Sequence, residues 1–352
     1  MYNSSITSCN VKSDYRGEYC MRNKIAGALF GMALGDAMGM PAELWGRERT
    51  RAFFGGPITE LIDGPVENDV AFNYKKGQFT DDTSQALVLL DSLEAKNYVP
   101  DAHDIATRML QWADKENAFE NNILGPTSKV ALANFRNGID DRSVTDKALS
   151  NGSAMRIPPI GCLFTPDQKE ALIEFVYGVS RVTHSSDVTI AGAAMIAEGV
   201  SSAIVNPKFD TIIADILSVE EAGYRRGCET FSPRLKARCE IGLELAQKYH
   251  GQDKVFLEKV YDIVGAGVGI IESVPAAVSI AYYAQDPNKS CLMCANLGGD
   301  TDTIGAMATA ICGAYTGADA IKPEYIETLK QQNNVDFEHY IDILVKGREL
   351  HR

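Results

Sequence analysis

Apolar residues in this chain recur at helical spacing, and clean apolar/polar alternation over the length of a strand is hard to find. Segments 188–205 and 304–315 are rich in Ala and Gly. Small residues let helices approach closely, so we expect these two helices near the centre of the protein. The helices expected from the pattern cover residues 25–38, 83–93, 101–114, 127–137, 168–182, 188–205, 210–223, 233–249, 271–285, 304–315, 323–332 and 336–348.

The order of these segments predicts the fold class, because strands do not alternate with helices. We predict an all-α protein in which residues 21–352 form a single domain, packed as an orthogonal multi-helix bundle. The longest segment without helical character is 51–78. A loop of that length inside a compact domain is usually functional. It leads directly into an acidic stretch at residue 80.

The charge and composition of the chain exclude several kinds of partner. The net charge of −13 and the lack of any basic run argue against a nucleic-acid partner. No apolar run reaches the length of a membrane span, and the N-terminus lacks an apolar secretory core, so we expect no membrane partner and a cytoplasmic location. Eight scattered cysteines do not suggest a disulfide framework. Cys291 and Cys294 form a lone C-x-x-C, and a zinc site would need a second pair of ligands. We expect these two cysteines one turn apart on a helix.

Two short acidic stretches are the main chemical signal: Thr80-Asp81-Asp82-Thr83 and Asp300-Thr301-Asp302-Thr303. Each follows a glycine-containing loop and precedes an apolar run. Four carboxylates brought together would repel one another unless a cation lay between them. Neither stretch contains Cys or His, so the ligands would be oxygens, which favour Mg²⁺ or Mn²⁺. Each stretch alone also fits an ordinary helix N-cap, but the doubled pattern favours metal binding.

Four stretches of the chain carry glycine-rich or polar motifs in a fixed order. They are Gly27 to Glu43, Gly77 to Thr83, Asn151 to Arg156 followed by Thr183-His184, and Gly298 to Gly305. Their order and spacing resemble the ADP-ribosylglycohydrolase family over residues 22–316. The resemblance implies an all-α fold with a binuclear Mg²⁺ or Mn²⁺ site. It also implies an enzyme that cleaves ADP-ribose from modified side chains or from related small conjugates.

Carried onto this sequence, the resemblance implies that six residues ligate two metal ions: Thr80, Asp81, Asp82, Asp300, Asp302 and Thr303. It implies that Glu43 is the general base that activates water for attack on an oxocarbenium-like state. Without the resemblance, Glu43 would be taken for a solvated surface residue. Asp36, inside an apolar helix, is expected to accept hydrogen bonds or to support the metal ligands.

The resemblance also implies a substrate-binding set: Gly125, Asn151, Gly152, Ser153 and His184. Freed N–H groups around residues 151–153 suit a diphosphate, although Asn and Ser also fit a plain helix cap. His184 would lie near the nucleotide. The nitrogenase-linked branch of the family has an Asp ahead of a glycine where 121–128 has none, which counts against that specialised role. Arg156 is expected in a buried structural pairing.

Residues 1–20 precede the usual family start. They fit a disordered tail, or an arm that binds an ADP-ribosylating toxin as some immunity relatives do. The preferred function is metal-dependent hydrolysis of the bond between ADP-ribose and a modified protein side chain, arginine above all. Two alternatives stay open: a phosphohydrolase with two Mg²⁺ ions, and a binding protein, such as an immunity factor or a relative whose chemistry has lapsed.

Overall fold

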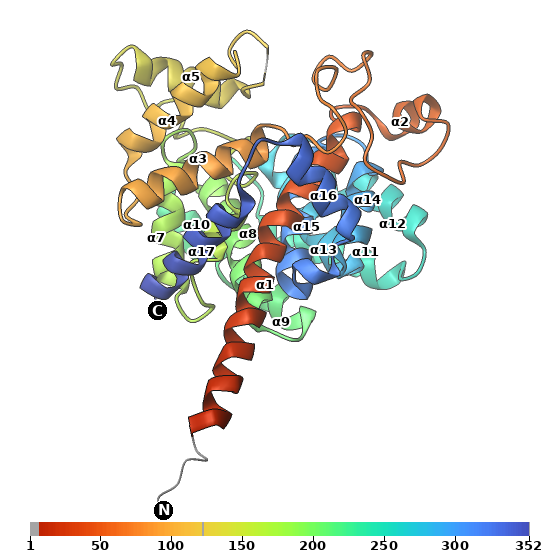
Figure 1. Cartoon of the computed structure of the whole chain (residues 1–352). Coiled ribbons are helices and arrows are strands. Elements are labelled where there is room, and N and C mark those ends of the chain that lie inside the picture. Colours follow the sequence, from red (N-terminus) through yellow and green to blue (C-terminus); the bar gives the residue numbers. More distant parts are fainter. Residues whose placement is uncertain (1–6, 122, 352) are drawn as a thin grey trace, which may run out of the picture.

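The structure is a computed structural model that describes residues 7–121 and 123–351 (Figure 1). Within these residues it is helical, with only isolated β-bridges, so the all-α prediction is confirmed. Three short elements, η1 (Met40–Ala42), η2 (Val260–Val264) and η3 (Ala318–Ala320), supplement the helices. The α-helices are α1 (Thr7–Gly39), α2 (Arg47–Phe53), α3 (Asp81–Ala95), α4 (Ala102–Lys115), α5 (Pro126–Arg136), α6 (Pro158–Gly161), α7 (Lys169–Ser180), α8 (Asp187–Val205), α9 (Phe209–Ser218), α10 (Glu220–Arg226), α11 (Leu235–Lys248), α12 (Asp253–Lys259), α13 (Ile270–Ala284), α14 (Pro287–Ala295), α15 (Thr301–Thr316), α16 (Pro323–Gln332) and α17 (Phe337–His351).

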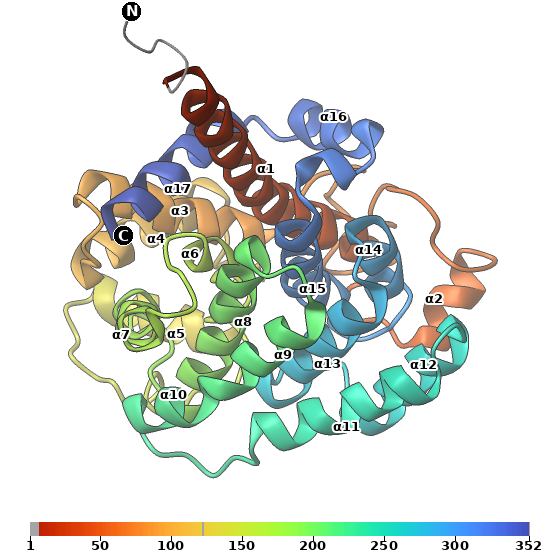
Figure 2. The ribbon, with the colours of Figure 1, turned by 90° about the horizontal axis from the view of Figure 1, so that it is seen from below.

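A close antiparallel pair, α1 and α15, forms the centre of the bundle (Figure 2). Four glycines of α1, spaced four residues apart, face four small residues of α15. A Cβ on Gly35 would lie only 2.0 Å from the carbonyl oxygen of Gly305. The contacts pair Gly27 with Gly313, Gly31 with Thr309, Gly35 with Gly305 and Gly39 with Thr301. This pairing places the C-terminal end of α1 beside the N-terminal end of α15.

Helices α8, α13 and α14 surround the central pair (Figure 2). Two segments, residues 17–42 and α8, are long and apolar enough to cross a membrane by length and composition alone, which the sequence pattern had not suggested. Nearly all of their apolar windows are buried inside the protein. That burial is typical of core helices. Cys291 and Cys294 lie one turn apart on α14, as expected, and both are buried.

Several short helices differ from the expected pattern. Segment 210–223 was expected as one helix, but the chain turns at Val219, which ends α9 and precedes α10. The turn lets α10 pack against α8 so closely that a Cβ on Gly223 would lie 2.6 Å from the Cα of Ala191. Helices α2 and α12 were not expected, because each has only seven residues and a weak periodic signal.

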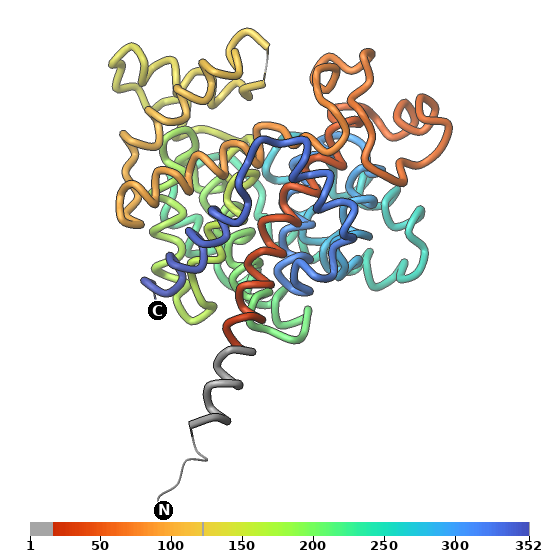
Figure 3. The backbone as a smooth tube through the Cα atoms, in the orientation of Figure 1, coloured from red at the N-terminus to blue at the C-terminus, as the bar shows by residue number. Residues whose placement is uncertain are grey.

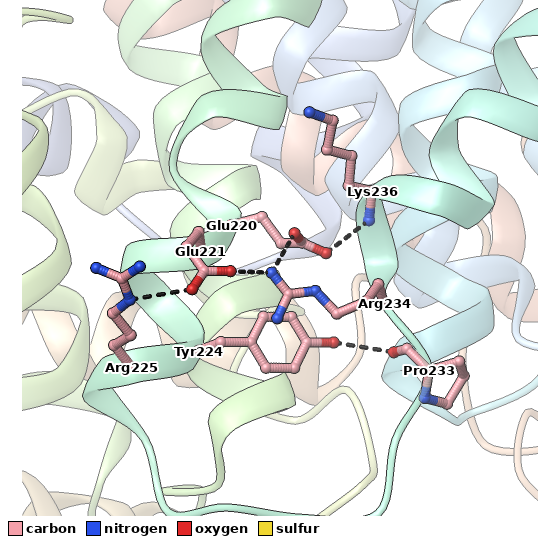
Figure 4. A network of polar contacts seen from close by, with 7 residues as sticks. All are labelled: Glu220, Glu221, Tyr224, Arg225, Pro233, Arg234 and Lys236. Carbon is pink, nitrogen blue, oxygen red and sulfur yellow. Dashed lines mark hydrogen bonds and ion pairs between the residues drawn. The ribbon is translucent and has the colours of Figure 1, made fainter.

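A polar network ties α10 to the start of α11 (Figure 4). Arg234 donates hydrogen bonds to both Glu220 and Glu221, and the backbone N–H of Lys236 donates to Glu220 at 2.8 Å. The hydroxyl of Tyr224 donates to the carbonyl of Pro233 at 2.9 Å. These bonds hold the connecting loop against α10.

The long loop between α2 and α3 projects from one end of the bundle (Figure 3). Asn68 is buried and holds this loop onto the end of α1: its amide donates to the carbonyls of Glu43 at 3.0 Å and Pro41 at 3.4 Å. Arg49 adds a bond to the carbonyl of Glu67 at 3.0 Å. The loop is therefore attached to the segment that carries Glu43.

The N-terminal extension is described only in part. Residues 1–6 lie outside the described residues, and the backbone from Thr7 onward belongs to α1. Tyr19 donates to Asp319 at 3.2 Å, and Arg22 pairs with Glu338 and Asp342 of α17. The start of the domain near residue 21 is thus attached to the rest of the chain. A toxin-binding role for residues 1–20 stays a prediction.

Replacing Gly35 by Ala should separate α1 from α15, because the new Cβ meets backbone that cannot move aside. We expect a loss of about 3 kcal/mol or more in the free energy of unfolding, measured by urea denaturation. Gly17→Ala is the matched control on the same helix: nothing lies within 4 Å of its Cβ, so the change should stabilise by up to about 1 kcal/mol. Equal effects of the two substitutions would contradict the close-contact interpretation.

Candidate active site

The structure brings the two acidic stretches together, although more than two hundred residues separate them. Thr80 caps the N-terminus of α3, and Asp300 stands at the N-terminus of α15. The hydroxyl of Thr80 lies 3.5 Å from a carboxylate oxygen of Asp302. The side chain of Thr303 lies near Asp82 and Asp300, where it lowers the pKa of each carboxyl. Two helix N-termini, each favourable for negative charge, therefore meet at one centre.

Asp36 of α1 lies beneath this centre, fully buried. Its carboxylate accepts hydrogen bonds from the N–H of Thr80 at 2.8 Å, the N–H of Thr83 at 3.0 Å and the hydroxyl of Thr83 at 2.6 Å. One side chain thus fixes both ends of the turn that presents Asp81 and Asp82. The expectation that Asp36 accepts hydrogen bonds within the helical core is confirmed.

Burial raises the pKa of every carboxyl in the centre, and repulsion between neighbouring carboxylates raises most of these pKa values further. Burial alone accounts for most of the rise at Asp36, whose pKa is about 6, and at Asp81, whose pKa is about 7. The pKa of Glu43 is raised well above its usual value by burial, then by the nearby charges of Asp300 and Asp81. Burial also raises the pKa values of Asp82, Asp300 and Asp302, and neighbouring carboxylates raise those of Asp82 and Asp302 further. Such a cluster requires protons or a cation.

Two carboxylate oxygens in the centre are buried and have no hydrogen-bond partner: Oδ2 of Asp82 and Oδ1 of Asp302. They come from opposite helices. A buried, unpaired carboxylate oxygen is costly, and a hard cation would satisfy it. The residues present therefore fit a divalent ion. Within residues 7–121 and 123–351 no three Asp, Glu, His or Cys side chains already stand as a ready-made ligand cluster, so threonine hydroxyls and water would have to complete the shell.

Glu43 directly follows η1 and is half-buried beside the acidic centre. Its neighbours are bound to the loop before Asp300: the N–H of Leu44 donates to Gly299 at 2.8 Å, and Gly299 donates to Trp45 at 2.8 Å. Gly299 has φ +80, and a Cβ there would lie 2.1 Å from the carbonyl oxygen of Ala266. Leu44 is itself held at φ 58, a conformation that costs a leucine roughly 1–2 kcal/mol. The backbone next to Glu43 is thus held in place.

The predicted substrate loop adjoins the opposite side of the centre. Asn151 donates to a carboxylate oxygen of Asp300 at 2.6 Å. Gly152 packs against the ring of His184, and the hydroxyl of Ser153 donates to the carbonyl of Thr189. In the described part of the chain, the backbone N–H groups of Gly152 and Ser153 have no hydrogen-bond partner. They leave two donors available beside Asp300.

His184 lies underneath this loop and is fully buried. Its ring nitrogens contact the hydroxyls of Thr183 at 2.8 Å and Ser150 at 2.9 Å. Burial, and then the charge of Arg156, lower its pKa to about 3, so the ring is neutral. The geometry makes it a support of the loop. Gly125 is exposed at the N-terminus of α5, and the hydroxyl of Thr127 in the first turn of that helix accepts a hydrogen bond from Ser150 at 3.3 Å.

A chain of buried polar contacts joins the two parts of the site. Gln85, four residues after Asp81 on α3, donates to Asp81 at 2.9 Å and accepts from Arg156 at 2.8 Å. Arg156 also donates to Thr183 at 2.6 Å. Arg156 is buried as expected, but the two side chains to which it donates hydrogen bonds are neutral. Neither Gln85 nor Asn68 was expected to support the site. The spacing of Gln85 from Asp81 could have indicated its role, whereas no sequence pattern indicates that of Asn68.

A cavity of about 670 Å³ opens beside the centre on the α3 side. Thr80 and Asp81 form its inner end, and Tyr74, Trp112 and Tyr340 are among its walls. The pKa of Tyr74 is raised by burial and by the carboxylates of the centre, Asp81 first. An acidic centre between a donor loop and a cavity of this size can hold an extended polar ligand.

The fold and the site define an all-α protein with a buried acidic centre built at two helix N-termini. A sequence model of the ADP-ribosylglycohydrolase family matches residues 19–352. The chain belongs to this family. Its relatives include "Uncharacterized protein YegU" of Escherichia coli K12, 44% identical and covering 93% of this chain and 97% of that protein.

Two further matches are more distant. "ADP-ribosylarginine hydrolase Tri1" of Pseudomonas putida is 23% identical and covers 89% of this chain and 76% of that protein. A solved structure described as an "ADP-ribosylglycohydrolase-related protein complex" superposes with a TM-score of 0.65 at 22% identity, covering 94% of this chain and 99% of that chain. The structural match supports the fold.

The raised pKa values predict how stability depends on pH once divalent cations are removed. Asp36 and Asp81 bind protons more tightly in the folded chain, with pKa values of about 6 and about 7, than at the ordinary value of 3.8. Their stabilising effect is therefore complete below about pH 4 and is lost as the pH rises through about 7. In EDTA the melting temperature should fall over this range, and Mg²⁺ or Mn²⁺ should restore it most at the upper end.

Calorimetry of two variants checks this prediction. Asp82→Asn removes one buried carboxylate and should flatten the fall, whereas Asp69→Asn, at an exposed position, should not. A melting temperature in EDTA that stays constant or rises between about pH 5 and about pH 7.5 would contradict the prediction.

Proposed function

We propose that this protein is a metal-dependent ADP-ribosyl hydrolase that cleaves the bond between ADP-ribose and a modified protein side chain, with arginine as the preferred linkage. The observation that carries the proposal is the pair of unpaired buried oxygens on Asp82 and Asp302, which come from two helices and lie beside a half-buried Glu43. Family membership supports ADP-ribosyl hydrolysis as the reaction class. The name of the Pseudomonas relative supports arginine.

Six residues would hold two divalent ions, Mg²⁺ or Mn²⁺: Thr80, Asp81, Asp82, Asp300, Asp302 and Thr303. When bound, such ions would offset the charge of the centre and orient ribose hydroxyls next to the scissile bond. Asp36 would keep its present partners and hold the α3 turn in register. The other side of the substrate would lie on the loop at residues 151–153, where the unpaired N–H groups of Gly152 and Ser153 suit a diphosphate.

Glu43 would serve as the general base. Its pKa is raised by burial and neighbouring carboxylates, which brings a carboxyl closer to the range in which it can take and return protons near neutral pH. The carboxylate accepts a proton from water as the water oxygen attacks the anomeric carbon. The bond from that carbon to the side-chain nitrogen breaks, and the leaving guanidino nitrogen receives the proton. The rigid backbone around Leu44 keeps the base in place for this step.

Replacing Glu43 by Gln should remove the base and preserve the fold. We expect release of ADP-ribose from ADP-ribosylarginine to fall by about 10²–10⁴-fold, while calorimetry shows that ADP-ribose still binds. Glu48→Gln, at an exposed position on α2, is the matched control and should react like the wild type. Wild-type protein that binds ADP-ribose without releasing it would indicate a binding protein, and release of inorganic phosphate would indicate a phosphohydrolase.

Removal of the metal should abolish turnover, and its return should restore it. We expect EDTA-treated protein to release no ADP-ribose until Mg²⁺ or Mn²⁺ is added. Independently of activity, Asp302→Asn should weaken Mn²⁺ binding by at least about tenfold in titration calorimetry, since it removes a charged ligand (~1.4 kcal/mol or more). Asp262→Asn, at an exposed position on η2, should leave Mn²⁺ binding unchanged. Activity that survives exhaustive chelation would contradict the role of metal.

A further inference from the structure

The 670 Å³ cavity beside the acidic centre has no role in the chemistry described so far. Its inner end is formed by Thr80 and Asp81, and it extends away from them to the last turn of α4 and the first turn of α17. At roughly 30 Å³ per water molecule it would hold about twenty waters. That is far more space than one amino-acid side chain fills.

The two sides of the acidic centre are not equivalent. On the α15 side, Asn151 is bonded to Asp300, and the unpaired N–H groups of the 151–153 loop lie next to it. On the α3 side, Asp81 opens directly into the cavity. A sugar held over the centre with its diphosphate on the loop would therefore direct its leaving group towards the cavity. This orientation rests on the proposed function.

The cavity walls suit a basic peptide segment. The charged lining residues are Asp81, Asp91, Glu116 and Lys115, so carboxylates outnumber the one ammonium group, which is itself paired with Glu116 at 3.3 Å. Aromatic rings supply flat surfaces on which a guanidinium or an aliphatic stem can lie: Phe72, Tyr74, Trp112 and Tyr340.

The rim also offers hydrogen-bonding groups for a peptide backbone. Asn73, Gln332 and Asn334 line the cavity and are exposed, and their side chains make no hydrogen bond within the described residues. Each amide can both donate to and accept from a peptide group. Phe72, on the same loop as Asn73, leaves about half of its surface exposed (49%). A free amino acid as the leaving group would be too small to contact these amides and the Phe72 ring together.

We propose that this cavity is the leaving-group side of the active site, and that it binds the polypeptide segment around the modified arginine, with a preference for neighbouring basic residues. Selection of the target would then depend on the walls of the cavity. Hydrolysis of a small conjugate would depend on the acidic centre alone.

Charge reversal at the rim tests the proposal without disturbing the core. The two probes are ADP-ribosylarginine and a lysine-flanked peptide that carries one ADP-ribosylated arginine. We expect Glu116→Lys to lower the ratio of kcat/KM for the peptide to kcat/KM for the small conjugate by about fivefold, through KM. Lys115→Glu should raise the same ratio. Both side chains are substantially exposed (43% and 80%), so the fold should tolerate both changes.

The matched control is Glu349→Lys, the same substitution at an exposed site near the far end of α17. Its ratio should equal that of the wild type. If Glu116→Lys, Lys115→Glu and Glu349→Lys all leave the ratio unchanged while the wild type hydrolyses both probes, the cavity proposal is wrong and the proposed function stands. If the wild type with metal releases ADP-ribose from neither probe, both proposals are wrong.

Discussion

The close contact between α1 and α15 is the constraint on which the rest of the site depends. Where Gly35 meets Gly305, the helix backbones touch without side chains between them. Antiparallel pairing at that separation places the end of α1, with Glu43 just beyond it, beside Asp300 and the first turn of α15. Larger residues along this seam would move Asp36, and with it the bonded turn at the start of α3, away from α15.

Electrostatic repulsion is the second constraint. The centre concentrates carboxyl groups whose pKa values are raised by burial, and at Glu43, Asp82 and Asp302 by neighbouring carboxylates as well. Asp36 adds to this repulsion, because its charge raises the pKa values of Asp81, Asp82 and Asp302, although its own carboxylate accepts three hydrogen bonds from the Thr80–Thr83 turn. Helix N-termini offset part of the repulsion. The remaining imbalance, concentrated on unpaired oxygens of Asp82 and Asp302, explains why the protein would bind cations there.

One part of the site is held by hydrogen bonds and packing, and another part is open to solvent. The backbone around Glu43 is bonded to Gly299 and to Asn68, and the 151–153 loop rests on a neutral, buried His184. In contrast, the cavity beyond Asp81 has exposed walls with unpaired amides. Chemistry that is common to a reaction class can thus occupy the rigid part, while recognition of a particular target depends on the open part.

The sequence alone determined the helical class and the two acidic stretches, because helical periodicity and repeated Thr/Asp patterns are local properties. It also indicated that Asp36 would accept hydrogen bonds, since an acid in an apolar helix must be satisfied. Only the tertiary structure decided that Gln85 joins Asp81 to Arg156, and that Asn68 anchors the Glu43 segment. It also decided that α9 and α10 are separate helices. These features depend on contacts between residues far apart in sequence, or on packing against a partner helix, which no local pattern contains.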